Sequence, residues 1–188
     1  RATASFVLYS KCLEKLVFVG DCQAAFLDGN GKMTSHISPE KHCDTIISQA
    51  RAMFWQAELL GRKCIPKGDP GRDLIHPLLL RQRRFQNNMH ASPLYRYWAM
   101  DGFFIEEEGI QVHNVPESTR EIILASDGYP KLYTTLQETE AHLHELIRKD
   151  PRMISDFLSA KGVREGAESF DDRTYLRIRI NNDIEDKT

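Results

Sequence analysis

Residues 121–130 read Glu-Ile-Ile-Leu-Ala-Ser-Asp-Gly-Tyr-Pro, and this stretch decides how the rest of the chain is interpreted. The short apolar run 122–125 contains β-branched residues, which predicts a strand buried on both faces. Asp127-Gly128 then ends the strand, because glycine permits a turn that other residues resist. Two interpretations stay open. The stretch is a plain strand followed by a turn, or Asp127 is a metal ligand held by a rigid element.

Two other aspartates occupy comparable places in the chain. Asp21 follows the apolar residues 16–19, and Asp171 precedes the alternating segment 174–180. If the strands are neighbours, the three carboxylates converge at one edge of a sheet. Carboxylates crowded together repel one another, so they bind either protons or a hard cation. Oxygen ligands favour Mg²⁺ or Mn²⁺ over zinc, so the sequence predicts a site for one of these ions.

The composition is that of a soluble globular protein. The chain has 188 residues, 41% hydrophobic and 28% charged, which predicts one domain spanning residues 1–188 with a core of its own. A formal net charge of −2 gives no reason to expect nucleic acid or an anionic membrane as a partner. The sequence contains no apolar run of membrane-spanning length, and its start lacks the charged, apolar and cleavage regions of a signal peptide, so we expect neither feature.

The cysteines and the first residue point to a cytoplasmic protein that is part of a longer product. The four cysteines form no C-x-x-C pair, which predicts reduced thiols and neither a disulfide framework nor a zinc site. They are Cys12, Cys22, Cys43 and Cys64. The chain begins at Arg1 instead of methionine, so we expect it to be a fragment.

Several short apolar segments predict strands. Residues 5–10 and 16–19 predict an antiparallel hairpin, and residues 23–27 predict a third strand before the turn 28–31. Three strands in close succession predict an antiparallel meander. Residues 110–115 then resume the sheet, and the alternation in 174–180 predicts a last strand with one buried and one wet face.

Helical spacing appears in the middle and in the last third of the chain. One apolar stripe predicts a helix that packs this stripe in the core, namely Ile46, Ala50, Met53, Phe54, Ala57 and Leu60. Asp73 predicts the N-cap of a second helix. Thr135 and Glu138 form a capping box for a third helix. Asp150 with the following proline predicts a fourth helix that ends at Gly162.

Three motifs of this sequence resemble those of a known family. Residues 122–128 resemble the strand-Asp-Gly motif of the metal-dependent protein phosphatases, the PPM or type 2C family. Residues 170–174 resemble their late Asp-Asn-x-Thr/Ser motif, with Asp172 in place of asparagine. Residues 19–22 resemble their Gly-Asp-Ser motif, with cysteine for serine. Each motif is weak alone, but the three follow the family's order and span the chain.

The resemblance implies an α+β fold in which an antiparallel β-sandwich is flanked by helices. It also implies a hydrolase that removes phosphate from phosphoserine and phosphothreonine in a phosphoprotein substrate, by attack of a water bridging two Mg²⁺ or Mn²⁺ ions. By this resemblance, Asp127 and Asp171 hold one of the two catalytic metals. Asp21, together with Asp127, belongs to a weaker third-metal site.

Two departures from the family affect these expectations. The early Asp-Gly-His-Gly-Gly motif and the early phosphate-binding arginine are absent, so we expect the N-terminal part of the same protein to complete the site. Lys131 stands where the family often has another aspartate, which would weaken a third-metal site. The alternative function is a catalytically inactive, phosphatase-like binding or regulatory module. A third possibility is an unrelated α+β domain whose Asp-Gly pairs are only turns.

Overall fold

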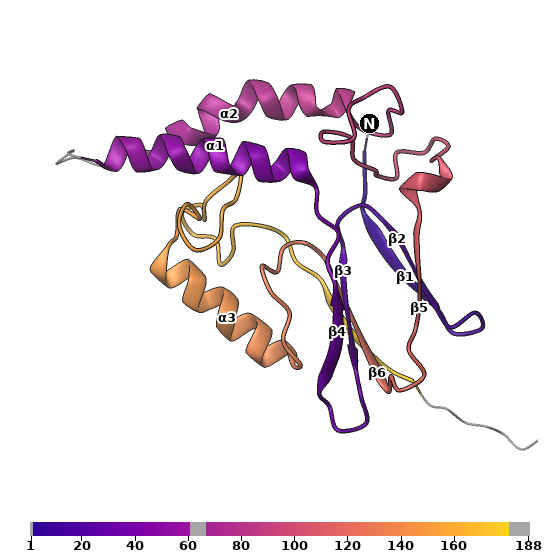
Figure 1. Ribbon diagram of the computed structural model, residues 1–188. Coiled ribbons are helices and arrows are strands. Elements are labelled where there is room, and N and C mark those ends of the chain that lie inside the picture. The colour runs from indigo at the N-terminus through magenta and orange to yellow at the C-terminus, as the bar shows by residue number, and fades with distance from the viewer. Residues whose placement is uncertain (1, 61–66, 181–188) are drawn as a thin grey trace, which may run out of the picture.

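A computed structural model describes residues 2–60 and 67–180 and has the expected α+β character. One antiparallel sheet has the order β1-β2-β5, with β1 at Phe6–Ser10, β2 at Lys15–Val19 and β5 at Gln111–Asn114. The other has the order β4-β3-β6-β7, with β3 at Gln23–Leu27, β4 at Met33–Ile37, β6 at Glu121–Ala125 and β7 at Tyr175–Arg179. The α-helices of the described residues are α1 (His42–Leu59), α2 (Pro70–Arg81) and α3 (Leu136–Lys149) (Figure 1).

The strand β6 has the burial that its sequence predicts. Ile122, Ile123, Leu124 and Ala125 are all buried, and β6 pairs with β3 on one side and β7 on the other. Because successive side chains of a strand point to opposite faces, β6 contributes to two hydrophobic clusters. Ile122 and Leu124 join the cluster between the two sheets, whereas Ile123 and Ala125 face the cluster beneath α3. A continuous apolar run is what such a doubly covered strand requires.

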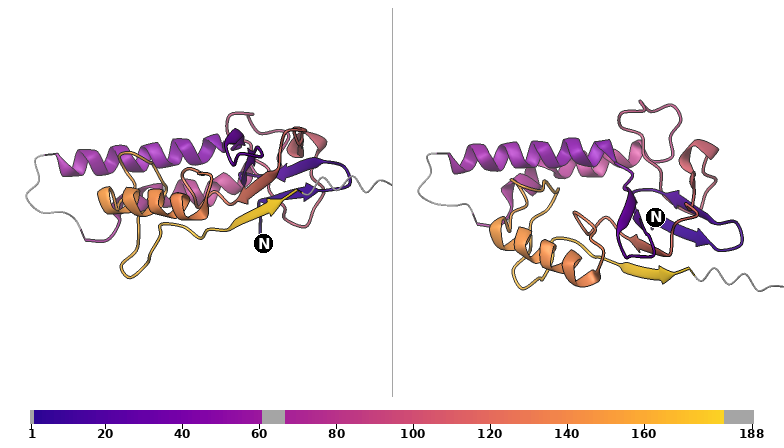
Figure 2. Two further views of the ribbon diagram at one scale, coloured as in Figure 1. Left: turned by 90° about the horizontal axis from the view of Figure 1, so that it is seen from below. Right: turned by 60° about the horizontal axis from the view of Figure 1, so that its bottom comes forward.

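The two sheets share one hydrophobic cluster, and α3 covers the opposite face of the four-stranded sheet. Leu16 and Phe18 of β2 pack in this shared cluster with Ala24 and Phe26 of β3. Leu143 of α3 packs on the other face. The helices gather at one end of the molecule and the strands at the other (Figure 2).

The predicted meander of the first three strands is wrong, although all three strands exist. β1 and β2 form the predicted hairpin, but β3 pairs with β4 and β6 in the other sheet. The chain changes sheets at Gly20, whose φ of +90° few other residues adopt and where a Cβ would lie 2.2 Å from Ser5 Oγ. The strand β4 escaped prediction because its segment Met-Thr-Ser-His-Ile is mostly polar and lies largely exposed at the sheet edge.

The helix α1 is confirmed, but most of the stripe predicted to face the core faces outward, and only Ala50 and Phe54 of it are half-buried. Met53 and Leu60 are 71% and 79% exposed, and Ile46 is also exposed. The buried side of α1 instead carries Arg51 and Trp55. Both side chains donate hydrogen bonds to Asp69, and the apolar residues Ile47 and Ala52 are buried with them.

Asp69, and not Asp73, caps α2. The Asp69 carboxylate accepts a hydrogen bond from the Arg72 N–H at 2.9 Å, and Pro70 occupies the first helical turn. The helix α2 therefore begins earlier than predicted, at a proline whose fixed φ suits this position.

The helix α3 begins at its predicted capping box, whereas the predicted fourth helix is wrong. Thr135 Oγ1 accepts the Glu138 N–H at 3.1 Å. Asp150 does not start a helix. It ends α3, and its Oδ2 accepts the N–H groups of Ile154 and Ser155 at 2.6 and 2.7 Å. With Met153 at a φ of +53°, residues 150–162 form an irregular loop.

Candidate metal centre

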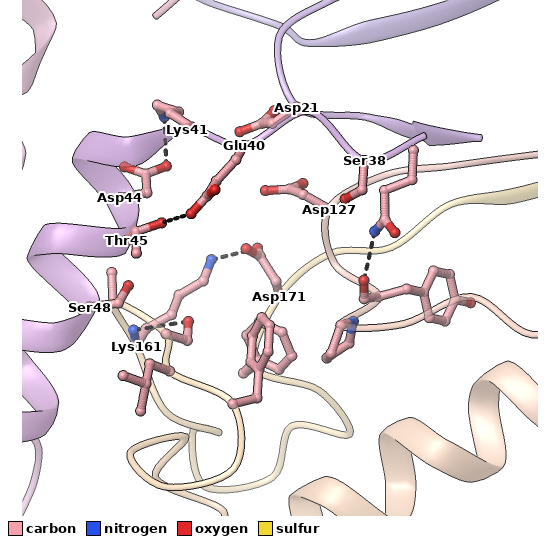
Figure 3. Close-up of a pocket in the computed structure, with 18 of the residues that line it drawn as sticks. Asp21, Ser38, Glu40, Lys41, Asp44, Thr45, Ser48, Asp127, Lys161 and Asp171 are labelled. Carbon is pink, nitrogen blue, oxygen red and sulfur yellow. Dashed lines mark hydrogen bonds and ion pairs between the residues drawn. The ribbon is translucent and has the colours of Figure 1, made fainter. Parts of the chain in front are cut away.

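The three predicted aspartates lie together at one edge of the four-stranded sheet. In the strand register, Gln23 of β3 pairs with Ala125 of β6, and Ala125 pairs with Tyr175 of β7. The start of β3, the end of β6 and the start of β7 are therefore neighbours. Asp21 comes just before β3, Asp127 just after β6 and Asp171 just before β7. All three line one cavity of about 600 Å³, and Figure 3 shows their carboxylates around it. The antiparallel pairing therefore brings three aspartates that are distant in the sequence together around one acidic cavity.

Gly128 lets the segments that carry Asp127 and Asp171 approach each other. Its φ is not left-handed, but a Cβ there would lie 2.1 Å from the backbone oxygen of Asp172. Ser126 completes the contact, since its Oγ accepts the Thr174 N–H at 3.0 Å. The glycine of the Asp-Gly pair is thus needed for close packing and not for a special turn angle.

The surroundings of Asp127 disfavour the charged form of its carboxyl group. Solvent reaches its side chain through the cavity, yet protein surrounds much of the carboxyl group. This burial, together with the charges of Asp21 and Asp171, raises the pKa of Asp127 from 3.8 to about 6. Burial, followed by the charges of Asp21 and Asp127, raises the pKa of the Cys22 thiol to about 11. Cys22 is therefore a protonated thiol at neutral pH.

Basic side chains border the acidic cavity. Lys161 Nζ donates to Asp171 Oδ1 at 2.5 Å, and this oxygen also accepts the Asp172 N–H at 2.9 Å. Lys41 pairs with Asp44 at 2.7 Å (Figure 3). Burial lowers the pKa of Lys41, but the pairing with Asp44 outweighs it and leaves the pKa raised. Asp171 and Asp44 are thus each neutralised by a lysine, whereas no ion pair to Asp127 occurs among the described residues.

The donor chemistry of the cavity fits a hard cation, because its three acids offer only oxygen atoms. In residues 2–60 and 67–180, no group of three or more His, Cys, Asp or Glu side chains is arranged closely enough to hold a metal ion. Metal ligation by Asp21, Asp127 and Asp171 therefore stays a prediction. Lys131 lies over the Tyr133 ring, 5.0 Å from its centre, and lines a different cavity beside α3.

Sequence patterns missed several residues that build this site. Gln23 Nε2 donates to the Tyr129 and Ser126 carbonyl oxygens at 2.7 and 3.2 Å, which ties β3 to the turn after Asp127. Glu140 accepts two hydrogen bonds from Arg173, so α3 holds the chain next to Asp171. Lys161 lies in the loop that was predicted to be a helix. No local sequence pattern predicts these contacts, because the two partners of each contact are distant in the sequence.

The raised pKa of Asp127 predicts a pH dependence of stability in the metal-free protein. The folded state holds the Asp127 proton more tightly than the unfolded state, so its stability falls as pH rises from about 4 to about 6 and the penalty persists above this range. We expect Asp127→Asn to remove this component. The free energy of unfolding of both proteins, measured by urea titration from pH 4 to 7.5, tests it. Parallel pH profiles would contradict the assigned repulsion.

Three of the four cysteines lie in the described part of the chain. Cys12, Cys22 and Cys43 are free thiols, and Cys64 lies outside the described residues. In the part of the chain that is described, no helix has the length and apolar character needed to cross a bilayer. Comparison of the chain with protein-family models, with curated proteins and with solved structures finds no match.

Proposed function

We propose that this chain is the C-terminal portion of a PPM-type phosphatase domain, which hydrolyses phosphoserine and phosphothreonine in phosphoproteins with Mg²⁺ or Mn²⁺. The observation that carries the proposal is the meeting of Asp21, Asp127 and Asp171 around one cavity. They come from three separate segments, and each belongs to a motif that resembles the family. Two antiparallel sheets with flanking helices are compatible with the sandwich expected of such a domain.

Each acid has a distinct role in the proposed reaction. Asp127 and Asp171 would hold one catalytic cation, and Asp21 with Asp127 would form a weaker site. Bound cations lower the pKa of a water and neutralise charge on the phosphoryl oxygens. The turn at Gly128 and the Gln23 side chain hold the Asp127 segment in place. Ser5 fixes Asp21, because its hydroxyl donates to Asp21 Oδ1 at 2.6 Å.

The partner that completes the domain is the N-terminal part of the same protein. β1 and β5 form the edges of the three-stranded sheet in the described residues. On its outer face Leu8, Val17 and Val112 stand in register across the strands, and Leu8 and Val112 are 50% and 53% exposed. Additional chain that covers this apolar row would stabilise the sheet. Free thiols at Cys12, Cys22 and Cys43 suit a cytoplasmic enzyme.

One observation favours the alternative, a phosphatase-like binding module without catalysis. The Lys161 ammonium already binds one oxygen of Asp171 and offsets its negative charge without any metal. A chain of this kind would keep the fold and the phosphoprotein partner while losing the reaction.

Phosphopeptide hydrolysis with Mn²⁺ separates these functions. We expect the 188-residue chain alone to be silent and to bind divalent metal weakly, because one or two carboxylates on a solvated edge seldom displace the waters of a hard cation. The chain joined to its N-terminal part is expected to hydrolyse the peptide. Robust turnover by the chain alone would refute the assignment of a missing part. Peptide binding without turnover by the joined protein would establish the binding module instead.

A further inference from the structure

Lys161 binds the Asp171 carboxylate that the proposed function assigns to a cation. Its Nζ lies 2.5 Å from Asp171 Oδ1, so the two charged groups are in direct contact. The two side chains are 34% and 30% exposed, so solvent screens this ion pair less than a fully exposed one. Lys161 also lines the same cavity as Asp21 and Asp127 (Figure 3).

The backbone that carries Lys161 is held firmly from both helices above the cavity. Arg51 of α1 donates to the Ser159 carbonyl oxygen at 2.9 Å. Arg72 of α2 donates to the Ala160 carbonyl oxygen at 2.7 Å. The two residues before Lys161 are therefore pinned, and its position beside Asp171 is set by the fold. Only the flexible four-carbon stem has to rotate for the ammonium to leave.

We infer that Lys161 acts as an internal counter-ion of the acidic cavity, which a divalent cation must displace from Asp171 in order to bind. This inference rests on the proposed function, because it concerns the same carboxylates. Asp171 Oδ1 already accepts both the Lys161 ammonium and the Asp172 N–H, so a cation that binds this oxygen must take the place of the ammonium, because two positive charges so close repel each other strongly. Lys161 is then a positioning residue that keeps Asp171 fixed without metal and lowers the affinity for metal.

The test is the affinity of the 188-residue chain for Mn²⁺, measured from the electron paramagnetic resonance signal of the free ion. Lys161→Met is compared with Lys131→Met, which removes the same charge from an exposed lysine outside the acidic cavity. We expect Lys161→Met to bind Mn²⁺ about tenfold more tightly than Lys131→Met, since a hydrogen bond between charged groups no longer opposes the metal. Lys161→Arg keeps the charge and is expected to bind no more tightly than wild type.

Two further variants keep the result interpretable. Lys161→Gln retains a neutral donor and is expected to lie between wild type and Lys161→Met, and it decides the matter if the methionine variant does not fold. Adding Asp171→Asn to Lys161→Met is expected to abolish the gain. Equal affinities of the two methionine variants, tighter binding by Lys161→Arg, or no Mn²⁺ binding by any variant would overturn the inference. Phosphopeptide hydrolysis by the joined protein tests the proposed function separately, since the affinity change requires no turnover.

Discussion

Replacing Arg51 by alanine is expected to lower the free energy of unfolding by about 3–5 kcal/mol, as the breaking of a buried ion pair does. The Arg51 side chain is only 1% exposed, and its Nη2 lies 2.7 Å from Asp69 Oδ2. Its Nη1 also donates to the carbonyl oxygens of Arg152 and Ser159, both at 2.9 Å. The substitution thus removes the charged partner of the Asp69 carboxylate and a donor from each of two loop carbonyls, besides opening a cavity. A loss of this size is a large part of the stability of an ordinary domain.

Asp69 shows how strongly the region depends on this arginine. Burial raises the pKa of Asp69, but hydrogen bonds from Arg51 and Trp55 outweigh burial and leave the pKa lowered. The carboxylate therefore stays charged, and it connects α1 to the start of α2. Without Arg51, it would be a partly buried charge with weaker compensation.

The matched control is Arg148→Ala, which removes an exposed arginine that also pairs with a carboxylate, Glu145. Solvent screens this pair, so its loss is expected to leave the unfolding midpoint nearly unchanged. Urea titration of the three proteins, with the slopes compared to exclude a change in cooperativity, gives the free energies. If Arg51→Ala were as stable as Arg148→Ala, the Arg51 contacts would not be what holds α1, α2 and the loop together.

Local patterns predicted the strands well where one segment carries its own signal. The apolar run of β6, the hairpin of β1 and β2 and the capping box of α3 are each complete within a few residues, and each is confirmed. Sheet membership is not local. The change of sheet at Gly20 depends on packing against Ser5, so proximity along the chain wrongly suggested a meander.

Polar contacts over long sequence distances explain the other errors. The face of α1 is mispredicted because the prediction rests on the apolar stripe alone, whereas Arg51 is buried on another face by its contact with Asp69, 18 residues later. The loop after Asp150 was taken for a helix because an Asp-Pro pair commonly begins one, whereas here the carboxylate closes a turn onto Ile154. The gathering of Asp21, Asp127 and Asp171 was anticipated from strand ends. Lys161 was not, since only the folded loop brings it to Asp171.

Asp127→Asn in the protein completed by its N-terminal part is expected to reduce Mn²⁺-dependent phosphopeptide hydrolysis by at least about 100-fold. Substitution of a residue that only supports a metal ligand commonly lowers metal affinity or activity by about 10- to 100-fold. Substitution of a ligand itself should lower activity by at least as much. Asparagine keeps the size of the side chain and removes the charge that attracts the cation. The fold should survive, because the substitution also relieves the repulsion from Asp21 and Asp171 that raises the pKa of Asp127.

Initial rates at saturating and at limiting Mn²⁺ test this expectation, with Asp156→Asn as the matched control. Asp156 is an exposed aspartate that lines the cavity beside α3, so its substitution is expected to leave the rate unchanged. Loss of activity in both variants would point to a general loss of charge or of folding, which unfolding curves would reveal. Near-wild-type hydrolysis by Asp127→Asn would show that Asp127 is not a ligand. The acidic edge of the sheet would then lack the role proposed for it, because Asp127 is the acid that the sites of Asp21 and Asp171 have in common.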